Sequence, residues 1–386
     1  MTRLNGFDGM RAIACLAVLF HHLMQRLGID SPVRYPADLA EAGVSLFFVL
    51  SGALLSYPFW RAYLQDKPLP NVKHYALHRA ARIVPAFYLV LLISVFVSAQ
   101  TGTSEYTMPR MVAGLLFLAP YHYISFFPAD LNGPLWSIGL EVSCYVLLPL
   151  FLIATWWLGN RRWWKAALVV IIGVLFLQWL NPWVVETFMT DAQNRGWQYG
   201  IIGGAKQWLP YWNVVSFMGQ FLCGSLAALA IAATSQRPMN KFQPAFDVLA
   251  ILSLFAAIYV IATFGQSGQP SRITQQPYFA PYFAFLCALT LFALSQSRWL
   301  YRLFDNPLFK KIATLSFGLY LWHMLIIESM AQFWVYDFYY HGVNDFWRWF
   351  GLSCAVVILS TLIAALSYRY FEKPILNWAR QWTTNH

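Results

Sequence analysis

The sequence predicts an all-α, polytopic membrane protein with about ten transmembrane helices. Hydrophobic residues make up 59% of its 386 residues, charged residues only 11%, and the mean hydropathy is +0.50. A soluble domain usually carries about 25% charged residues. Because so little charge cannot cover a water-facing surface, the lipid bilayer is the solvent that suits this chain.

The distribution of basic residues argues against a nucleic-acid-binding protein, and the spacing of the cysteines argues against a metal-binding or disulfide-linked protein. The net charge is +10, but the lysines and arginines occur in short clusters between apolar stretches, as residues that orient membrane spans do. No nucleic acid is therefore expected as a partner. The cysteines show no CxxC or Cys/His spacing, so neither a metal site nor a disulfide framework is predicted. All five lie in apolar stretches: Cys15, Cys144, Cys223, Cys287 and Cys354.

Ten stretches are apolar over roughly the 20 residues that a membrane-spanning helix needs. They are 8–26, 41–60, 83–99, 138–158, 166–180, 211–233, 247–264, 279–295, 315–335 and 346–367. The first has no signal-peptide cleavage site of the A-x-A type and contains Arg11, His21 and His22. It is therefore expected to stay in the protein as its first span.

An eleventh apolar stretch, 111–127, contains Pro120 and His122 and leads into a loop-like segment. If it does not cross the membrane and the N-terminus is cytoplasmic, most of the 26 lysines and arginines fall on the cytoplasmic side, as the positive-inside rule requires. If it crosses, every later loop changes sides and this agreement is lost. The sequence therefore predicts ten spans, cytoplasmic N- and C-termini, and a re-entrant or interfacial segment near 111–127.

Residues 1–386 are expected to form a single membrane-embedded domain, with no soluble domain after the last span. The outer loop 181–210 is rich in tryptophan, glycine and polar residues, which suits either part of an acceptor-binding surface or an ordinary connection. The sequence shows no internal repeat of the kind found in inverted-repeat transporters. The expected location is a bacterial cytoplasmic (inner) membrane, with membrane lipids as partners.

Two ionisable residues of the first span are predicted to share one helix face. Arg11 and His22 are eleven residues apart, which at about 100° per residue is within about 20° of whole turns. Their separation along the helix axis is about 16 Å, and His21 points about 80° away from their common face. Ionisable groups inside spans favour a functional reading. The alternative is that Arg11 snorkels to the inner headgroups and both histidines lie at the outer interface.

Glu141 lies just inside the outer end of its predicted span, in LWSIGLEVSCYVLLP. A carboxylate reaches the interface less easily than Lys or Arg, which favours an inward-facing polar role. The alternative is a structural hydrogen bond to Ser137 or Tyr145, each one turn away. Since imidazole has an unperturbed pKa near 6.5, a neutral histidine oriented by a carboxylate is a suitable general base. We therefore hypothesise that His22 and Glu141 form such a pair.

A basic segment, HYALHRAARIVPAFY, ends the cytoplasmic loop 61–82. Arg79 and Arg82 are spaced i, i+3, so on a helix they lie on one side, and guanidinium groups suit phosphate recognition. The alternative is ordinary topogenic charge. His323, in SFGLYLWHMLI, is a further polar residue inside a span. Packing in the core or in a substrate pocket is the default interpretation, and a catalytic role is the alternative.

Six segments, in order along nearly the whole chain, resemble the acyltransferase-3 family of integral membrane acyltransferases. They are GFDGMRAIACLAVLFHH, GVSLFFVLSGALLS, HRAARIVPAFY, GPLWSIGLEVSCYVLLP, SFGLYLWHMLI and SYRYFEKPI. The resemblance implies a membrane O-acyltransferase of about ten spans. Acyl-CoA, first of all acetyl-CoA, would be its co-substrate, with no permanently bound cofactor. A hydroxyl of a carbohydrate or glycosylated molecule would be its acceptor.

The resemblance also implies roles for individual residues. His22 is the expected catalytic histidine, Arg11 its partner in handling acyl-CoA, and Glu141 the acidic position after the Trp-Ser pair. Arg79 and Arg82 match the basic motif at the CoA end. Four more residues are assigned to substrate-binding or supporting positions: Trp136, Tyr145, Ser51 and His323.

The expected reaction is acyl transfer to a surface polysaccharide, a lipid-linked glycan or a glycosylated small molecule such as a macrolide. His22 either deprotonates the acceptor hydroxyl or first takes the acyl group itself, and the sequence leaves both routes open, together with the acyl chain length and the oligomeric state. The alternative function is a secondary transporter or flippase for an anionic or sugar-containing solute, which would also need intramembrane His, Glu and Arg. The lack of repeats argues against it.

Overall fold

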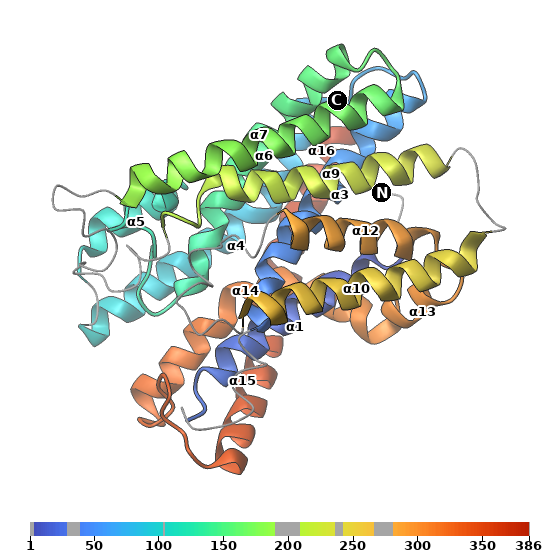
Figure 1. The fold of residues 1–386 in the computed structure, drawn as a ribbon. Helices are drawn as coiled ribbons and strands as arrows, with labels where there is room; N and C mark the ends of the chain where they lie inside the picture. The colour runs from blue at the N-terminus through green and yellow to red at the C-terminus, as the bar shows by residue number, and fades with distance from the viewer. Residues whose placement is uncertain are drawn as a thin grey trace. The chain divides into compact units, whose positions relative to one another are not determined.

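The computed structural model describes residues 4–28, 39–102, 105–189, 209–235, 242–265 and 281–385. These residues are almost entirely helical, and their only β-type pairing is an isolated bridge between Leu27 and Val343. Within the described ranges, nine helices are long and apolar enough to cross a membrane, and Tyr282–Gln296 is a shorter apolar helix. The all-α, polytopic prediction is therefore confirmed (Figure 1). The cytoplasmic placement of the two termini stays a prediction.

The chain divides into two compact units. Unit 1 comprises Met1–Ala14, Ala42–Pro70 and Leu140–Lys311, and unit 2 comprises Cys15–Glu41, Asn71–Gly139 and Ile312–His386.

The centre of unit 1 is the pairing of α3 (Gly43–Leu64) with α9 (Val214–Ser235). Two glycines allow the backbones to approach: a Cβ at Gly52 would lie 2.1 Å from the carbonyl oxygen of Phe221, and one at Gly224 would lie 2.0 Å from that of Val49. Small residues at membrane helix interfaces permit this close packing. The indole N–H of Trp60 donates to Ser225 Oγ at 2.9 Å, so a buried polar group is satisfied across the same interface.

The remaining helices of unit 1 surround this pair. α7 (Trp163–Met189) packs on α9, and α12 (Tyr282–Gln296) packs on α9, on α3 and beside α10 (Gln243–Gly265), as Figure 1 shows for α10 and α12. Large apolar side chains such as Leu175 and Phe255 are exposed on α7 and α10, as expected of surfaces that face lipid.

Unit 2 is built around two parallel helices, α1 (Phe7–Met24) from Cys15 onward and α14 (Pro307–Phe333) from Ile312 onward (Figure 1). Cys15 Sγ contacts the Ser316 carbonyl oxygen at 3.6 Å, and His22, seven residues later, contacts His323, also seven residues later. α15 (Phe346–Ser367) joins them, because the indole N–H of Trp349 donates to the Leu23 carbonyl at 2.8 Å.

The segment 111–127 does not form a continuous span. Its helix α5 (Thr107–Leu115) has nine residues and is therefore about 13.5 Å long, too short to cross the hydrocarbon layer. Irregular chain follows, interrupted by the 3-10 turns η2 (Ala119–Tyr121) and η3 (Gly133–Leu135) before α6 (Trp136–Leu158). Arg110, which is 2% exposed, pairs with Asp130 and donates to the Phe127 carbonyl at 2.7 Å.

Two predicted boundaries were wrong. α4 (Val72–Thr101) begins well before residue 83, because the Asn71 side chain caps it by accepting from the backbone N–H groups of Lys73 and His74, and hydropathy does not detect a polar helical start. α7 continues through 181–189, which had been placed in a loop; residues 190–208 of that loop lie outside the described part. After α15, a π-helical turn η6 (Tyr368–Glu372) leads into α16 (Lys373–Asn385).

The α3–α9 contact predicts a difference between two glycines of one helix. Gly224→Ala places a methyl group against the Val49 carbonyl. Since overpacking typically costs about 1–3 kcal/mol, this variant should have a lower free energy of unfolding and a lower thermal midpoint than the wild type. Gly219→Ala, where a Cβ meets no described atom within 4 Å, should leave the thermal midpoint of the purified protein in nanodiscs unchanged or slightly higher. Equal midpoints for the two variants would contradict this packing.

Candidate active site

Two histidines of unit 2 meet between α1 and α14. Nδ1 of His22 lies 3.0 Å from Nε2 of His323, and the ring centroids are 5.1 Å apart with an interplanar angle of 39°. His323 is 1% exposed, whereas His22 is only partly buried. The pair therefore has an inner member, fully enclosed by protein, and an outer member that retains accessible surface.

The hydrogen bonds of the inner histidine determine which nitrogens carry protons. Nδ1 of His323 lies 2.9 Å from the carbonyl oxygen of Leu319, and a carbonyl can only accept, so this nitrogen is the N–H donor. In a neutral ring, Nε2 of His323 is then an acceptor, and the group that donates to it is Nδ1–H of His22. Nε2 of His22 is consequently the basic nitrogen of the pair, in the arrangement that suits a general base.

An ion pair and a histidine–glutamine contact lie beside the two histidines. Arg26, one turn beyond His22, pairs with Glu328 of α14, with Nη2 and Oε1 2.6 Å apart. Gln25 Nε2 and His21 Nε2 are 3.0 Å apart. Arg26 and Glu328 were not identified from the sequence. The available signal was their charge, because both fall within stretches predicted to span the membrane, 8–26 and 315–335.

The irregular chain before α6 supports α14 directly next to His323. The side-chain amide of Asn132 donates to the Leu321 carbonyl at 2.9 Å and to Ser94 Oγ at 3.1 Å. The Tyr320 hydroxyl lies 2.7 Å from Ser137 Oγ and donates to the Pro134 carbonyl at 2.9 Å. Nearby, Trp136, predicted to contact substrate, is 5% exposed and stacks on Phe126 with ring centroids 5.7 Å apart.

Glu141 belongs to unit 1, where it has two partners predicted to lie near the site. Ser51 Oγ donates to its Oε1 at 3.0 Å, and the Tyr145 hydroxyl donates to the same oxygen. The contact with Tyr145, one turn along α6, is the structural alternative considered for this carboxylate. The proposed pairing of Glu141 with His22 connects different units and stays a prediction; the partner that the structure gives His22 is His323.

The predicted CoA-end arginines both lie on α4. Arg82 is 3.3 Å from Oε2 of Glu372, which is 3% exposed on the π-helical turn, and it stacks over the Phe317 ring at 5.2 Å. Arg79 is partly buried one turn earlier. Arg11, the remaining predicted residue, lies on α1 together with His22. The two residues are therefore about 16 Å apart along the helix axis, as expected from the sequence.

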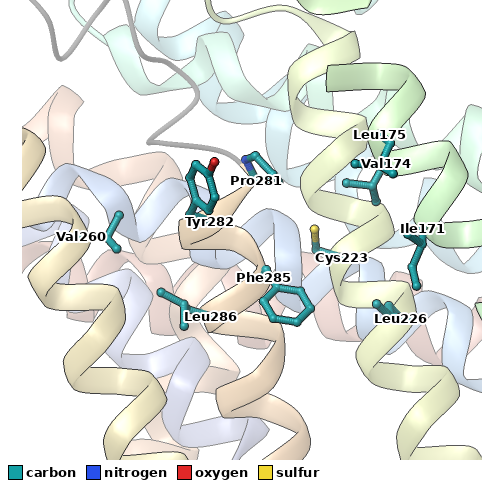
Figure 2. Close-up of a pocket in the computed structure, with 10 residues that line it drawn as sticks. All are labelled: Ile171, Val174, Leu175, Cys223, Leu226, Val260, Pro281, Tyr282, Phe285 and Leu286. Carbon is teal, nitrogen blue, oxygen red and sulfur yellow. The ribbon is translucent and has the colours of Figure 1, made fainter. Parts of the chain in front are cut away.

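Unit 1 contains an apolar cavity of about 550 Å³ between α7, α9, α10 and α12 (Figure 2). Its lining residues are Ile171, Val174, Leu175, Cys223, Leu226, Val260, Pro281, Tyr282, Phe285 and Leu286. Hydrocarbon side chains predominate, and no carboxylate, imidazole or basic group is among them. This lining suits hydrocarbon contact and offers no imidazole or carboxylate as a general base, so the candidate active site is the histidine pair.

Comparison with known proteins yields one family. A family model described as an acyltransferase domain matches residues 4–365. Proteins of Staphylococcus aureus named "Putative O-acetyltransferase" are 22% identical over 98% of this chain and 59% of their own length. Nodulation protein 10 of Rhizobium leguminosarum bv. viciae is 26% identical over 96% of this chain and 93% of that protein.

A "Putative peptidoglycan O-acetyltransferase" of Bacillus subtilis is 24% identical over 96% of this chain and 54% of its own length. The chain thus spans less than two thirds of the Staphylococcus and Bacillus relatives. No solved structure matches it.

The hydrogen-bond pattern predicts the tautomers of three histidines. His22 and His323 should be protonated at Nδ1, whereas His122, whose Nδ1 accepts from the backbone N–H of Ile124 at 3.2 Å, should be protonated at Nε2. ¹⁵N spectra of histidine-labelled protein in nanodiscs, recorded with neutral rings and assigned by single substitutions, would check this. An Nε2–H tautomer of His22 in the wild type would contradict this arrangement.

Proposed function

The chain belongs to the acyltransferase-3 family of membrane acyltransferases, and from this we propose that it transfers a short acyl group, first of all acetyl, from acyl-CoA to a hydroxyl of a carbohydrate. The observation that carries the proposal is the contact between His22 and His323. It supplies a basic imidazole nitrogen in a partly accessible position, which acyl transfer to an alcohol requires.

In the proposed reaction, Nε2 of His22 takes the proton of the acceptor hydroxyl as its oxygen attacks the thioester carbonyl. The tetrahedral intermediate then expels the CoA thiolate, and the proton on Nε2 passes to the leaving sulfur, so His22 ends neutral. The imidazolium form of His22 is stabilised in between, because its Nδ1–H donates to His323 Nε2. We favour this direct route over an acyl-histidine intermediate, since one neutral base performs both proton transfers.

Arg79 and Arg82 are the proposed contacts for the phosphates of acyl-CoA. Arg82 is 22% exposed in its side chain and is already oriented by Glu372, and a guanidinium offers a fork of donors to phosphate oxygens. Arg11, on the face of α1 that also carries His22, is the proposed contact along the path from the phosphates to the thioester.

The acceptor class is proposed from the named relatives. One is named a peptidoglycan O-acetyltransferase, so a cell-surface glycan is the acceptor class to test first. A protein that moves solute across a vesicle membrane without acyl-CoA would instead support the transporter or flippase alternative.

Replacing the proposed base should abolish transfer. In nanodiscs with radiolabelled acetyl-CoA and soluble glycan fractions, His22→Ala should lower the rate of glycan labelling by about 10²–10⁴-fold, the usual contribution of general base catalysis. His122→Ala, which removes an exposed histidine, should label at the wild-type rate. Undiminished labelling by folded His22→Ala would overturn the assignment.

Removing the Arg82 guanidinium should weaken donor binding. The double variant Arg82→Gln, Glu372→Gln avoids an unpaired buried carboxylate, and it should raise KM for acetyl-CoA at least about tenfold, since hydrogen bonds to charged groups contribute about 1.5–3 kcal/mol. Lys73→Gln, on the exposed start of α4, should leave this KM unchanged. An unchanged KM in the double variant would exclude Arg82 from the donor site.

A further inference from the structure

Arg26 and Glu328 connect the same two helical segments as the histidine pair, one turn further along. His22 contacts His323 at 3.0 Å, and Arg26, four residues later, pairs with Glu328 at 2.6 Å. The ion pair is therefore the nearest charged neighbour of the histidine pair along both chain segments, four residues beyond His22 and five residues beyond His323.

The guanidinium of Arg26 is buried but incompletely hydrogen-bonded. Its side chain is 3% exposed, and its Nη2 also contacts Met324 Sδ at 4.0 Å. Among the residues that the structure describes, no group accepts a hydrogen bond from its Nε. A buried, charged donor without an acceptor is unfavourable, so packing of the fold alone does not account for an arginine at this position.

The carboxylate of Glu328 is the accessible half of the pair, with its side chain 20% exposed. An ionised carboxylate only accepts hydrogen bonds and an arginine only donates them. A hydroxyl group does both, so neighbouring hydroxyls of a sugar ring can donate to Glu328 and accept from Arg26. A phosphate or carboxylate ligand fits less well, because it would meet the Glu328 charge.

We propose that Arg26 and Glu328 form the acceptor-binding subsite, which holds hydroxyls of a carbohydrate so that a neighbouring hydroxyl reaches Nε2 of His22. This inference rests on the proposed acyltransferase function. It assigns Arg26 and Glu328 to the binding of the acceptor, and leaves proton transfer to His22.

A purely structural role predicts different behaviour. Arg26 also helps to join the end of α1 to the chain before α15, since the Val343 N–H donates to its carbonyl at 3.0 Å. That bond uses the backbone, so a change in either side chain leaves it in place. If the ion pair only stabilised the fold, its loss would lower the thermal midpoint and leave the kinetic constants of the folded fraction unchanged.

The test uses full-length protein in nanodiscs, acetyl-CoA as donor, and a panel of muropeptides and neutral oligosaccharides as acceptors. Glu328→Gln and Arg26→Lys should raise KM for the acceptor at least tenfold. The KM for acetyl-CoA, and its slow hydrolysis without acceptor, should stay within twofold of wild type. The matched control is Asp337→Asn, which breaks the exposed ion pair with Arg348 in the same unit (2.8 Å) and should change neither constant.

Direct binding of the same glycans, measured without donor, separates this inference from the proposed function. If the wild type binds a glycan and Glu328→Gln binds it at least tenfold more weakly, the acceptor subsite is supported, even if no acyl transfer is observed and the proposed function fails. Unchanged acceptor KM and binding in folded Glu328→Gln would overturn it, as would a parallel loss of acetyl-CoA hydrolysis or no binding of any glycan. Should Glu328→Gln fail to fold, the double variant Arg26→Gln, Glu328→Gln, which leaves no unpaired charge, gives the same readout.

Discussion

The site depends on one hydrogen bond, between Nδ1 of His323 and the backbone carbonyl of Leu319. An imidazole enclosed by apolar helices must find its partners within the protein, because an unsatisfied polar group there is costly. The carbonyl oxygen has two lone pairs, so it can accept from the ring as well as from the helix backbone. This bond determines the tautomer of His323, and through it which nitrogen of His22 is basic.

The segment that interrupts the pattern of spans supports this arrangement. Irregular backbone is tolerated among apolar helices only where protein groups satisfy it. Tyr320 does so here by donating to the Pro134 carbonyl, and the Asn132 side chain adds a bond from the same chain to the Leu321 carbonyl of α14, shortly before His323. The same contacts restrict the rotation of α14 about its axis, so the short helix α5 and the loop after it belong to the scaffold of the histidine pair.

Hydropathy was sufficient to predict the spans and the place of His22 on α1, because both are properties of a single segment. It could not pair His22 with His323, since that contact joins residues 301 positions apart and depends on how α1 and α14 pack. Nor could it detect the polar start of α4. The contact of Arg82 with Glu372 was missed because these residues are 290 positions apart and meet only when their helices pack. Arg26 and Glu328, in contrast, carried a readable signal, as charged residues within predicted spans.

Two arginine–glutamate pairs among the described residues of unit 2 are better explained by function than by stability. A buried ion pair seldom stabilises a fold more than apolar residues of similar volume, because both charges lose their hydration. In each pair one partner is almost fully buried, Arg26 in one and Glu372 in the other, while the opposite partner keeps accessible surface. The buried member of each pair therefore holds the accessible member in place. Next to the histidines the accessible group is Glu328, a hydrogen-bond acceptor. On α4 the accessible group is Arg82, a hydrogen-bond donor. That difference in chemistry matches the two substrates proposed, hydroxyls at the first position and phosphates at the second.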